Sequence, residues 1–429
     1  MKVSKSTLDY INRDKSIFAT VQHIADLPFV ISKAQGFYLY DTEDKAYLDF
    51  TSGACTMNLG YDRAHVADST SFPFPYALGC AQIEYGSRLI EKYTFYKDKK
   101  MMFCVTGSDA NDGAIKIVRA YSQRKMVVTF SGNYHGTTYG AASLTSLEGR
   151  LDNHLGPMLP YITILPFCPY DASDEAVDEC LARFTSLDLN DVAGVFLECI
   201  QGDTGMLPIN TTFLERLNAI CKEHKILIVS DEVQMACYRT GPFFSIENYP
   251  FVKPDLITMG KHIGGGIPLG AIIGRQEVMQ SLKPCEHAFS MAGNFEACMR
   301  GLYNFNIIED RDFKLQLAKR MALMDFFMDD LCHNFSDIVI KCCGVGLARA
   351  VFVRSLYASD TDNEACYKII CSCFGRGLYL MRIGSNWLRL EPFLNMPEDL
   401  MLKAFDIIKE AFYEYRSNKI DDGVKKYMS

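Results

Sequence analysis

The sequence predicts an α/β protein with a large, doubly wound, mainly parallel sheet domain and a smaller C-terminal α+β domain. Short apolar runs alternate with amphipathic stretches between residues 100 and 275, and this alternation gives way to a long helical stretch after residue 301. Hydrophobic residues fill 48% of the 429 positions and charged residues 22%, so both domains can bury a core. We expect an N-terminal segment, 1–50, that packs with the small domain, a large domain, 51–300, and a small domain, 301–429.

The apolar runs of the first pattern are typical of buried strands. They cover residues 101–105, 126–130, 192–198, 226–230, 255–259 and 269–274. Helical periodicity fills several of the gaps, and the clearest example, 211–224, stands directly before one of the runs. This order of strand, helix and strand predicts a parallel sheet that is covered on both faces.

The second pattern predicts the smaller domain. A helical stretch over 302–334 is followed by expected strands near 337–341, 347–353, 378–382 and 387–390, and by a closing amphipathic helix near 398–415. The sequence contains no internal repeat and no low-complexity segment, which excludes solenoids and tandem arrays.

Composition excludes several classes of function. The net charge of −8 and the absence of a basic block argue against a nucleic-acid partner. The N-terminus is charged and no apolar run reaches 18 residues, so we expect a soluble, cytoplasmic protein without membrane contact. The 16 cysteines include no CxxC pair and many stand in apolar runs, which predicts reduced core thiols and no metal site.

In doubly wound sheets, ligands bind beyond the carboxyl ends of the strands, so the residues after each strand are the candidates for chemistry. After 101–105, Gly107-Ser108 form a tight turn into a helix, with Ser108 expected as the N-cap. The free NH groups of such a helix end attract an anion. A capped turn that binds nothing is the simpler alternative.

An acid and a lysine follow two further strands. Asp231 comes at the end of 226–230, where a buried carboxylate needs a cation or a donor. Lys261 follows 255–259 and precedes a run of three glycines; a desolvated lysine can act as a nucleophilic amine, although exposed loop lysines are commoner. No GxGxxG motif opens a helix here, which excludes a nicotinamide site. A phosphate anchor, an acid and an amine are together what pyridoxal 5′-phosphate requires.

The motifs resemble those of the class III aminotransferases, fold type I pyridoxal-phosphate enzymes with a seven-stranded large sheet, over residues 20 to 416. In chain order the motifs are Gly107-Ser108-Asp109-Ala110-Asn111, Phe130-Ser131-Gly132-Asn133-Tyr134-His135-Gly136, Glu198-Cys199-Ile200-Gln201-Gly202-Asp203, Asp231-Glu232-Val233-Gln234, Gly260-Lys261-His262 and Ser290-Met291-Ala292-Gly293-Asn294. The resemblance implies cofactor contacts from Gly107, Ser108, Asp109, Tyr134, His135, Glu198, Asp231, Val233, Gln234, Lys261 and Ser290.

The resemblance also implies a role for each main position. Lys261 would form the Schiff base, Asp231 would hold the pyridine nitrogen, and Tyr134 and Val233 would cover the two faces of the ring. Gln234 would meet the ring oxygen. Ser290 stands in the stretch that reaches the phosphate of the neighbouring subunit, which implies a homodimer with shared active sites or a higher oligomer.

Arg389 falls where many members bind a substrate carboxylate, although a surface or interdomain ion pair is an alternative. The chain departs from the family pattern at four places: Asp203 replaces a common Glu, Met235-Ala236-Cys237-Tyr238 replaces a glycine-rich run, Phe295 replaces a proline, and Glu391-Pro392 replaces Pro-Pro. These changes concern the substrate side and leave the cofactor expectation intact.

Three functions remain open at this point. The first is an aminotransferase that joins an amino acid or amine with a keto acid or aldehyde, using Lys261 to move the proton. The second is an amino-acid racemase or epimerase, because several motifs look like the branch that contains isoleucine 2-epimerase; Asp203 is then the candidate for the second acid or base. For Asp203, a structural loop carboxylate is the alternative. The third is a catalytically silent pyridoxal-phosphate-binding protein.

Overall fold

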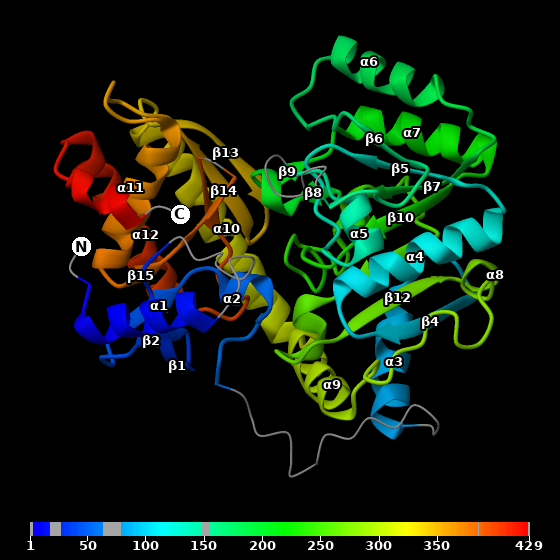
Figure 1. The fold of residues 1–429 in the computed structure, drawn as a ribbon, viewed down its shortest axis with the longest axis horizontal. Coiled ribbons are helices and arrows are strands. Elements are labelled where there is room, and N and C mark those ends of the chain that lie inside the picture. The colour runs from blue at the N-terminus through cyan, green and yellow to red at the C-terminus, as the bar shows by residue number, and fades with distance from the viewer. Residues whose placement is uncertain (1–2, 18–26, 63–78, 148–154, 385, 428–429) are drawn as a thin grey trace. The chain divides into compact units, whose positions relative to one another are not determined.

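The computed structural model describes residues 3–17, 27–62, 79–147, 155–384 and 386–427 (Figure 1). The described residues form two compact units. One unit falls within residues 65–314, and the other combines residues from 1–64 and 315–429.

The first unit is built on the predicted sheet, which is mainly parallel and has seven strands. Their order across the sheet is β4 (Lys99–Cys104), β12 (Gly270–Arg275), β11 (Leu256–Met259), β10 (Leu227–Asp231), β7 (Val192–Leu197), β5 (Met126–Phe130) and β6 (Ile162–Leu165). Only β12 runs antiparallel to its neighbours. The strand missing from the prediction is β6, an edge strand whose residues are mostly only half-buried or exposed, so its apolar signal is short.

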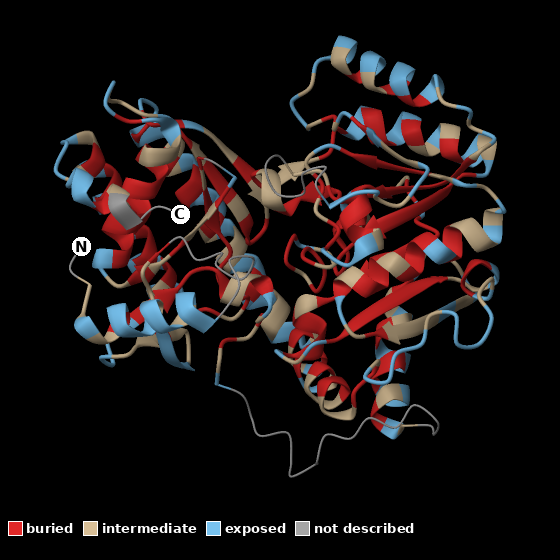
Figure 2. Cartoon of the chain, viewed as in Figure 1, coloured by how far each residue is buried: buried red, intermediate tan, exposed pale blue. Residues whose placement is uncertain are grey.

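Helices flank this sheet, and the structure adds short elements in the loops. The helices are α3 (Cys80–Lys92), α4 (Gly107–Ser122), α5 (Tyr139–Leu144), α6 (Asp174–Thr185), α7 (Thr211–His224), α8 (Gln276–Met279) and α9 (Phe295–Glu309); 3₁₀ turns are η3 (Gly202–Thr204), η4 (Ser245–Asn248) and η5 (Lys261–Gly264), and β8 (Ile200–Gln201) pairs with β9 (Leu207–Pro208). Every residue of β7, β10 and β11 is buried, as the red strands of Figure 2 show. This burial places the middle of the sheet in the core.

Helix α4 positions much of the site because it packs along the sheet. Ala110, Ala114, Ile117 and Val118 are fully buried and join the core cluster that includes side chains of β7, β10 and β11. Tyr121, in the last turn of the helix, is 39% exposed. The helix is thus held along its length while its first turn stays at the carboxyl edge of the sheet.

The second unit contains two four-stranded sheets. One has the order β1 (Ile31–Gln35), β2 (Tyr38–Asp41), β3 (Ala46–Asp49), β15 (Leu378–Tyr379), and the other β13 (Val339–Val345), β14 (Ala348–Val353), β17 (Trp387–Leu390), β16 (Met381–Ile383). Its helices are α1 (Lys5–Ile17), α2 (Ser52–Cys55), α11 (Asp362–Gly375), α12 (Glu398–Arg416) and most of α10 (Arg311–Asn334), with η6 (Asp422–Tyr427) at the end.

Two predicted elements are divided in the structure. The helix expected over 302–334 is interrupted at Asp310, whose Oδ1 accepts hydrogen bonds from the backbone N of Asp312 and Phe313 at 2.9 and 3.0 Å and so caps α10. The strand expected over 378–382 is split between β15 and β16, which belong to different sheets. Both errors arise because periodicity does not register a break of one residue.

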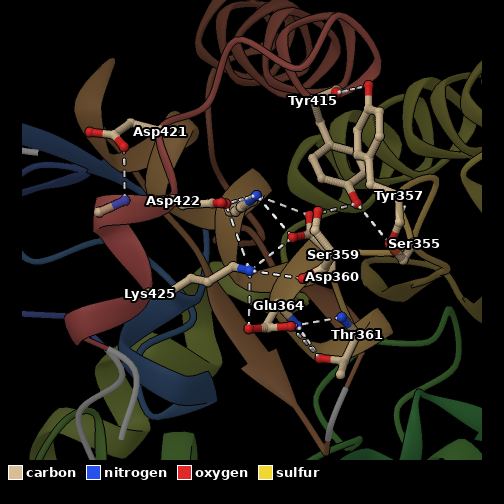
Figure 3. A network of polar contacts seen from close by, with 12 residues as sticks. Ser355, Tyr357, Ser359, Asp360, Thr361, Glu364, Tyr415, Asp421, Asp422 and Lys425 are labelled. Atoms are coloured by element: carbon tan, nitrogen blue, oxygen red, sulfur yellow. Dashed lines mark hydrogen bonds and ion pairs between the residues drawn. The ribbon is translucent and has the colours of Figure 1, made fainter.

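A cluster of charges fixes the C-terminal turn η6 to α11 (Figure 3). Lys425 Nζ lies 2.9 Å from Oδ1 of Asp360 and 3.2 Å from Oε1 of Glu364. The buried Lys368 Nζ lies 3.0 Å from both carboxylate oxygens of Asp360, and it also pairs with Asp422. Asp360 therefore receives two ammonium groups while its own side chain is removed from water.

Eleven of the 16 cysteines are buried, and all 16 are free thiols. Among the described residues, no three His, Cys, Asp or Glu side chains are grouped so that they could hold a metal ion. None of the described helices is both long enough and apolar enough to cross a membrane.

Candidate active site

Most of the side chains predicted to carry chemistry gather at one edge of the seven-stranded sheet. Strands β4, β5, β7, β10 and β11 run in the same direction, so their carboxyl ends meet at that edge. Asp231 is the last residue of β10, Glu198 follows β7 directly, and Lys261 follows β11 after a single glycine.

Three donors fix the carboxylate of Asp231. His135 Nδ1 and Asn111 Nδ2 each lie 2.7 Å from Oδ2, and the backbone N of Val233 donates to Oδ1 over 3.0 Å. Asn111 is itself oriented by Thr258, whose Oγ1 donates to Asn111 Oδ1 over 2.8 Å. In the folded protein, hydrogen bonds from these three donors thus replace the hydrogen bonds of the buried carboxylate to water, and they hold it in one orientation.

The imidazole of His135 is held on both sides. Its Nε2 lies 3.1 Å from Nδ2 of Asn133, and Gln201 Nε2 donates to Oδ1 of the same asparagine over 2.6 Å, which sets the orientation of that amide. Because Asn133 Nδ2 is a donor, Nε2 of His135 accepts, and Nδ1 carries the proton that is shared with Asp231. His135 is therefore a buried support of the carboxylate.

Lys261 is half-buried, and its Nζ donates to Oε1 of Gln234. The backbone of Lys261 has φ +50°, a left-handed conformation that is uncommon for a residue with a Cβ. The amide of Gln234 lies against Gly202, where a Cβ would come within 3.0 Å of Gln234 Cδ. The amine and its amide partner are therefore placed by close backbone approach.

The first turn of α4 has a different cap from the one that the sequence predicted. The N-cap is Thr106, not Ser108: Thr106 Oγ1 accepts from the backbone N of Asp109 over 3.3 Å, and Asp109 Oδ1 accepts from the backbone N of Thr106 over 2.5 Å. This capping box wins because Asp109 stands at the third helical position, where its carboxylate reaches back to the cap. The carboxylate of Asp109 is thus engaged with the backbone of residues 105 and 106.

Ser108 and Gly107 face the neighbouring loops. Ser108 Oγ accepts from the backbone N of Thr137 over 3.3 Å. A Cβ on Gly107 would lie 2.6 Å from both Cγ atoms of Val233, so only glycine fits between the helix start and that side chain. The N-terminus of this 16-residue helix can hold an anion close to Val233.

Glu198 is a second buried carboxyl group at this edge. It accepts hydrogen bonds from the backbone N of Tyr134 at Oε2 (2.8 Å) and of Gly202 at Oε1 (3.3 Å). Burial raises the pKa of Glu198 well above its usual range, and the charges of Asp231 and Asp203 raise it further. The site therefore places a carboxyl group that favours its protonated form beside a carboxylate held by donors.

Tyr134 and Asp203 both interact with Glu198. Tyr134 is half-buried and is tied to Glu198 through its backbone. Asp203 is half-buried in η3, and its charge acts on Glu198. The turn ends at Gly205 with φ +97°, a left-handed value that favours glycine.

Two further predicted residues stand on other elements of the chain. Ser290 is exposed, in the segment between α8 and α9. Arg389 is buried on β17 of the second unit, where its Nε lies 3.5 Å from Oε2 of Glu391. This ion pair is buried and lies within one unit, so it is neither the surface pair nor the interdomain pair that was the alternative for this arginine.

The sequence analysis assigned no role to Asn111, Asn133 or Gln201, which orient Asp231 and His135. A signal for Asn111 exists, because a buried asparagine interrupts the apolar stripe of α4 one turn after its start. Asn133 and Gln201 lie in loops, where polar residues are ordinary.

The arrangement supplies three chemical functions at one edge. A carboxylate with fixed geometry can accept from a protonated ring nitrogen, a lysine amine can act as nucleophile and base, and a helix N-terminus can hold a phosphate.

Residues 20–412 match the family model described as aminotransferase class-III. Among curated proteins, the chain is 30% identical to the leucine/methionine racemase of Thermococcus litoralis over 98% of both chains, and 29% identical to the isoleucine 2-epimerase of Lentilactobacillus buchneri over 96% of this chain and 95% of that protein. It is 28% identical to the acetylornithine aminotransferase of Caldanaerobacter subterraneus, over 91% of this chain and 96% of that protein.

The fold is shared with solved structures as well. The ornithine aminotransferase of Toxoplasma gondii superposes with a TM-score of 0.84 at 24% identity and covers 97% of each chain.

Proposed function

The chain belongs to the class III aminotransferases, whose cofactor is pyridoxal 5′-phosphate, and we propose that it transfers an amino group from an amino acid or amine to a keto acid or aldehyde, with Lys261 as the cofactor-bearing amine. The single observation that carries this proposal is the oriented carboxylate of Asp231 at the same sheet edge as Lys261. A lysine after a strand is by itself an ordinary feature. A buried carboxylate that three donors hold in one orientation is typical of a functional site.

The residues present fit the cofactor by the chemistry of their donors. Asp231 would hold the ring nitrogen, the first turn of α4 at Gly107 and Ser108 would hold the phosphate, and Lys261 would hold the aldehyde carbon. Val233 against Gly107 leaves an apolar wall beside the helix end, as a ring needs. When bound, the cofactor supplies an electron sink for the carbon that loses a proton.

The chain's own residues then have separate tasks. Once the incoming amino group has displaced it from the cofactor, Lys261 Nζ would take the proton from the substrate carbon and deliver it, on the same side, to the exocyclic carbon of the cofactor, which is all that amino transfer requires. Asp231 holds its partner nitrogen protonated, with His135 and Asn111 keeping the carboxylate in place. Gln234 keeps Nζ close to the reacting carbon. Arg389 would hold a substrate carboxylate.

The second candidate is an amino-acid racemase or epimerase. Two observations favour it: the relatives named leucine/methionine racemase and isoleucine 2-epimerase, and the presence of Asp203 in η3 with its charge acting on Glu198. Inversion needs a proton donor on the side opposite Lys261, and either Asp203 or a group that it controls would supply one.

The third candidate is a protein that holds the cofactor without turnover. The absence of products would distinguish it from the other two, because neither a keto acid nor the opposite isomer would form from any amino acid.

One experiment separates the three. The holoenzyme is incubated with single L-amino acids in turn, without a keto acid, and the keto acid released and the chiral composition are both measured by chromatography. Release of one keto-acid equivalent per active site, followed by arrest, is the result expected for amino transfer. Continued appearance of the D or allo isomer would instead establish racemisation, and no change with any substrate would leave the silent protein.

A further inference from the structure

The loop that follows Gln234 contains two consecutive residues in a left-handed conformation, although neither is glycine. Cys237 has φ +58° and Tyr238 has φ +69°. Such values are disfavoured for residues with a Cβ and persist only when surrounding contacts impose them. The backbone N of Cys237 donates to Phe243 O over 2.7 Å, which closes the loop but does not hold Tyr238.

The contacts that hold Tyr238 come from three helices. Its hydroxyl donates to Oε1 of Glu309, the last residue of α9, over 2.5 Å. Lys92 Nζ, at the end of α3, lies 2.5 Å from Oε2 of Glu309 and 3.2 Å from the hydroxyl. Lys314 Nζ of α10 lies 3.0 Å from the same Oε2 and 4.7 Å from the centre of the Tyr238 ring. We call Tyr238, Glu309, Lys92 and Lys314 the clasp.

The protonation states of the clasp residues favour a stable hydrogen bond between Tyr238 and Glu309. Burial and the neighbouring Glu309 raise the pKa of Tyr238, so its hydroxyl keeps its proton. Although burial alone would raise the pKa of Glu309, hydrogen bonds from Lys92, Tyr238 and Lys314 lower it, so the carboxylate stays ionised. A neutral donor therefore faces a charged acceptor across the neutral range, and such bonds are about twice as strong as neutral ones.

The loop held in this way leads directly into the site. Gln234 stands four residues before Tyr238, and its Oε1 accepts from Lys261 Nζ. On its other side the amide lies against Gly202, so it has little room to adjust if its backbone shifts. Ahead of Gln234, the chain is anchored by Glu232, which accepts from the backbone N of Ser245 and Ile246 over 2.7 and 2.9 Å.

We propose that Tyr238 is a positioning residue: its bond to Glu309 keeps Cys237 and Tyr238 in their left-handed conformation, and this holds Gln234 Oε1 at Lys261 Nζ. The inference rests on the proposed role of Lys261. The clasp then has a function beyond stability, because the loop that it restrains leads to the residue that contacts the reacting amine.

Two substitutions at one position test this. Tyr238→Phe keeps the ring and the left-handed backbone but removes the hydroxyl. Tyr238→Gly removes the hydroxyl and the ring, but glycine adopts positive φ without steric strain. If the clasp positions the loop, Tyr238→Gly should keep the site closer to the wild type than Tyr238→Phe does. If Tyr238 merely fills space, Tyr238→Phe should be the closer of the two.

Three measurements report on the site itself: the dissociation constant of pyridoxal phosphate titrated into apoenzyme, the pH midpoint of the visible absorbance of the holoenzyme, and kcat separated from KM. For Tyr238→Phe we expect roughly tenfold weaker cofactor binding, a shifted midpoint and a kcat lowered by about the same factor, because a hydrogen bond to a charged group is lost. Tyr238→Gly should lie closer to the wild type in all three.

Glu309→Leu tests the other half of the clasp, because it removes the acceptor of the Tyr238 hydroxyl together with the ion pairs to Lys92 and Lys314. Its effect combined with that of Tyr238→Phe should be smaller than the sum of the two single effects, because both substitutions remove the same hydrogen bond. Tyr413→Phe, on an exposed tyrosine of α12, is the matched control and should change nothing.

The inference is overturned if Tyr238→Phe equals the wild type, or if Tyr238→Gly binds the cofactor more weakly than Tyr238→Phe. These outcomes differ from failure of the role proposed for Lys261, in which the wild-type holoenzyme would show no lysine-linked absorbance at all.

Discussion

Nδ1 of His135 lies 2.7 Å from Oδ2 of Asp231, and both side chains are buried. His135 follows β5, whereas Asp231 ends β10, with β7 between the two strands. A hydrogen bond across a whole strand of the sheet fixes the carboxylate from the side, while Asn111 fixes it from α4. The acid can therefore offer its remaining lone pairs in one direction only.

The first prediction concerns this acid. Asp231→Asn should reduce the rate of proton removal from substrate by about 100-fold or more, because the ring nitrogen would lose the charge that keeps it protonated. Cofactor affinity should fall much less, since we expect the N-terminus of α4 to hold the phosphate. Single-turnover rates and a cofactor titration measure the two effects, with the exposed Asp421→Asn as control. Wild-type single-turnover rates in Asp231→Asn would mean that another residue holds the nitrogen.

The second prediction concerns the amine. Lys261→Ala should abolish turnover and leave the far-ultraviolet circular dichroism unchanged, because the side chain is only half-buried and lies in a short 3₁₀ turn. Borohydride reduction of the holoenzyme followed by peptide mass spectrometry should locate the cofactor on Lys261. The exposed Lys253→Ala provides the control. A cofactor-modified peptide from any other lysine would remove Lys261 from its role.

The sequence was sufficient to predict the large sheet, because its central strands are buried on both faces and therefore appear as unbroken apolar runs. It also predicted that Asp231 and Lys261 would share an edge, since both directly follow such strands. The edge strand β6 and the sheet β1-β2-β3-β15 escaped prediction; in β6 and β1 no face is uniformly buried.

What the sequence could not provide was the set of partners. The bond between His135 and Asp231 joins residues 96 positions apart, and the clasp bond between Tyr238 and Glu309 joins residues 71 apart. Such pairs depend on strand order and helix ends, which local patterns do not encode. The Thr106 cap was missed for a different reason, because Ser108 and Thr106 are both good N-caps and only the reach of Asp109 decides between them.

The third prediction uses the charge cluster of Figure 3. Burial alone would raise the pKa of Asp360, but hydrogen bonds from Lys425 and Lys368 lower it below its usual 3.8. A carboxylate with a lowered pKa in the folded state stabilises the protein above about pH 4 and loses that effect as the pH falls through its folded value. Asp360→Asn should cost about 3 kcal/mol at pH 7, since the buried Lys368 loses a fully buried charged partner and keeps the exposed Asp422.

Thermal unfolding of the holoenzyme between pH 7 and pH 3 measures this effect. The midpoint of the wild type should approach that of Asp360→Asn as the pH falls, whereas Asp421→Asn, an exposed neighbour in a local turn, should follow the wild type throughout. A constant gap between the wild type and Asp360→Asn at every pH would rule out the charge as its cause.

The fourth prediction is a homodimer with shared active sites. Ser290 is exposed, and its neighbours Phe289 and Met291 are 38% and 44% exposed, so an apolar segment is available for a two-fold contact. Ser290→Ala should weaken phosphate binding by up to about tenfold through the partner subunit. Sedimentation at assay dilution together with cofactor titration measures both; fully active monomers would contradict the prediction.

The last prediction decides between amino transfer and racemisation, and it depends on Asp203. Lys261 can move a proton on one side of the substrate carbon, so net inversion requires a second group on the other side. Asp203 lies in η3, and its charge raises the pKa of the buried Glu198, which couples the two carboxyl groups. A shorter Asp, in place of the Glu that is common in the family, changes where this charge stands.

Asp203→Asn removes the charge and keeps the size. The measurement is solvent deuterium exchange at the α-carbon, followed separately for each enantiomer of one amino acid. In a transaminase, only one enantiomer exchanges, and Asp203→Asn should slow that exchange and amino transfer by the same modest factor, because Asp203 then only arranges the loop. In a two-base racemase both enantiomers exchange. The substitution should then slow exchange from one enantiomer by about 100-fold or more, and it should leave exchange from the other enantiomer, on which Lys261 acts, unchanged. Since we propose amino transfer, we expect the first result, and loss from a single enantiomer would replace that proposal with racemisation.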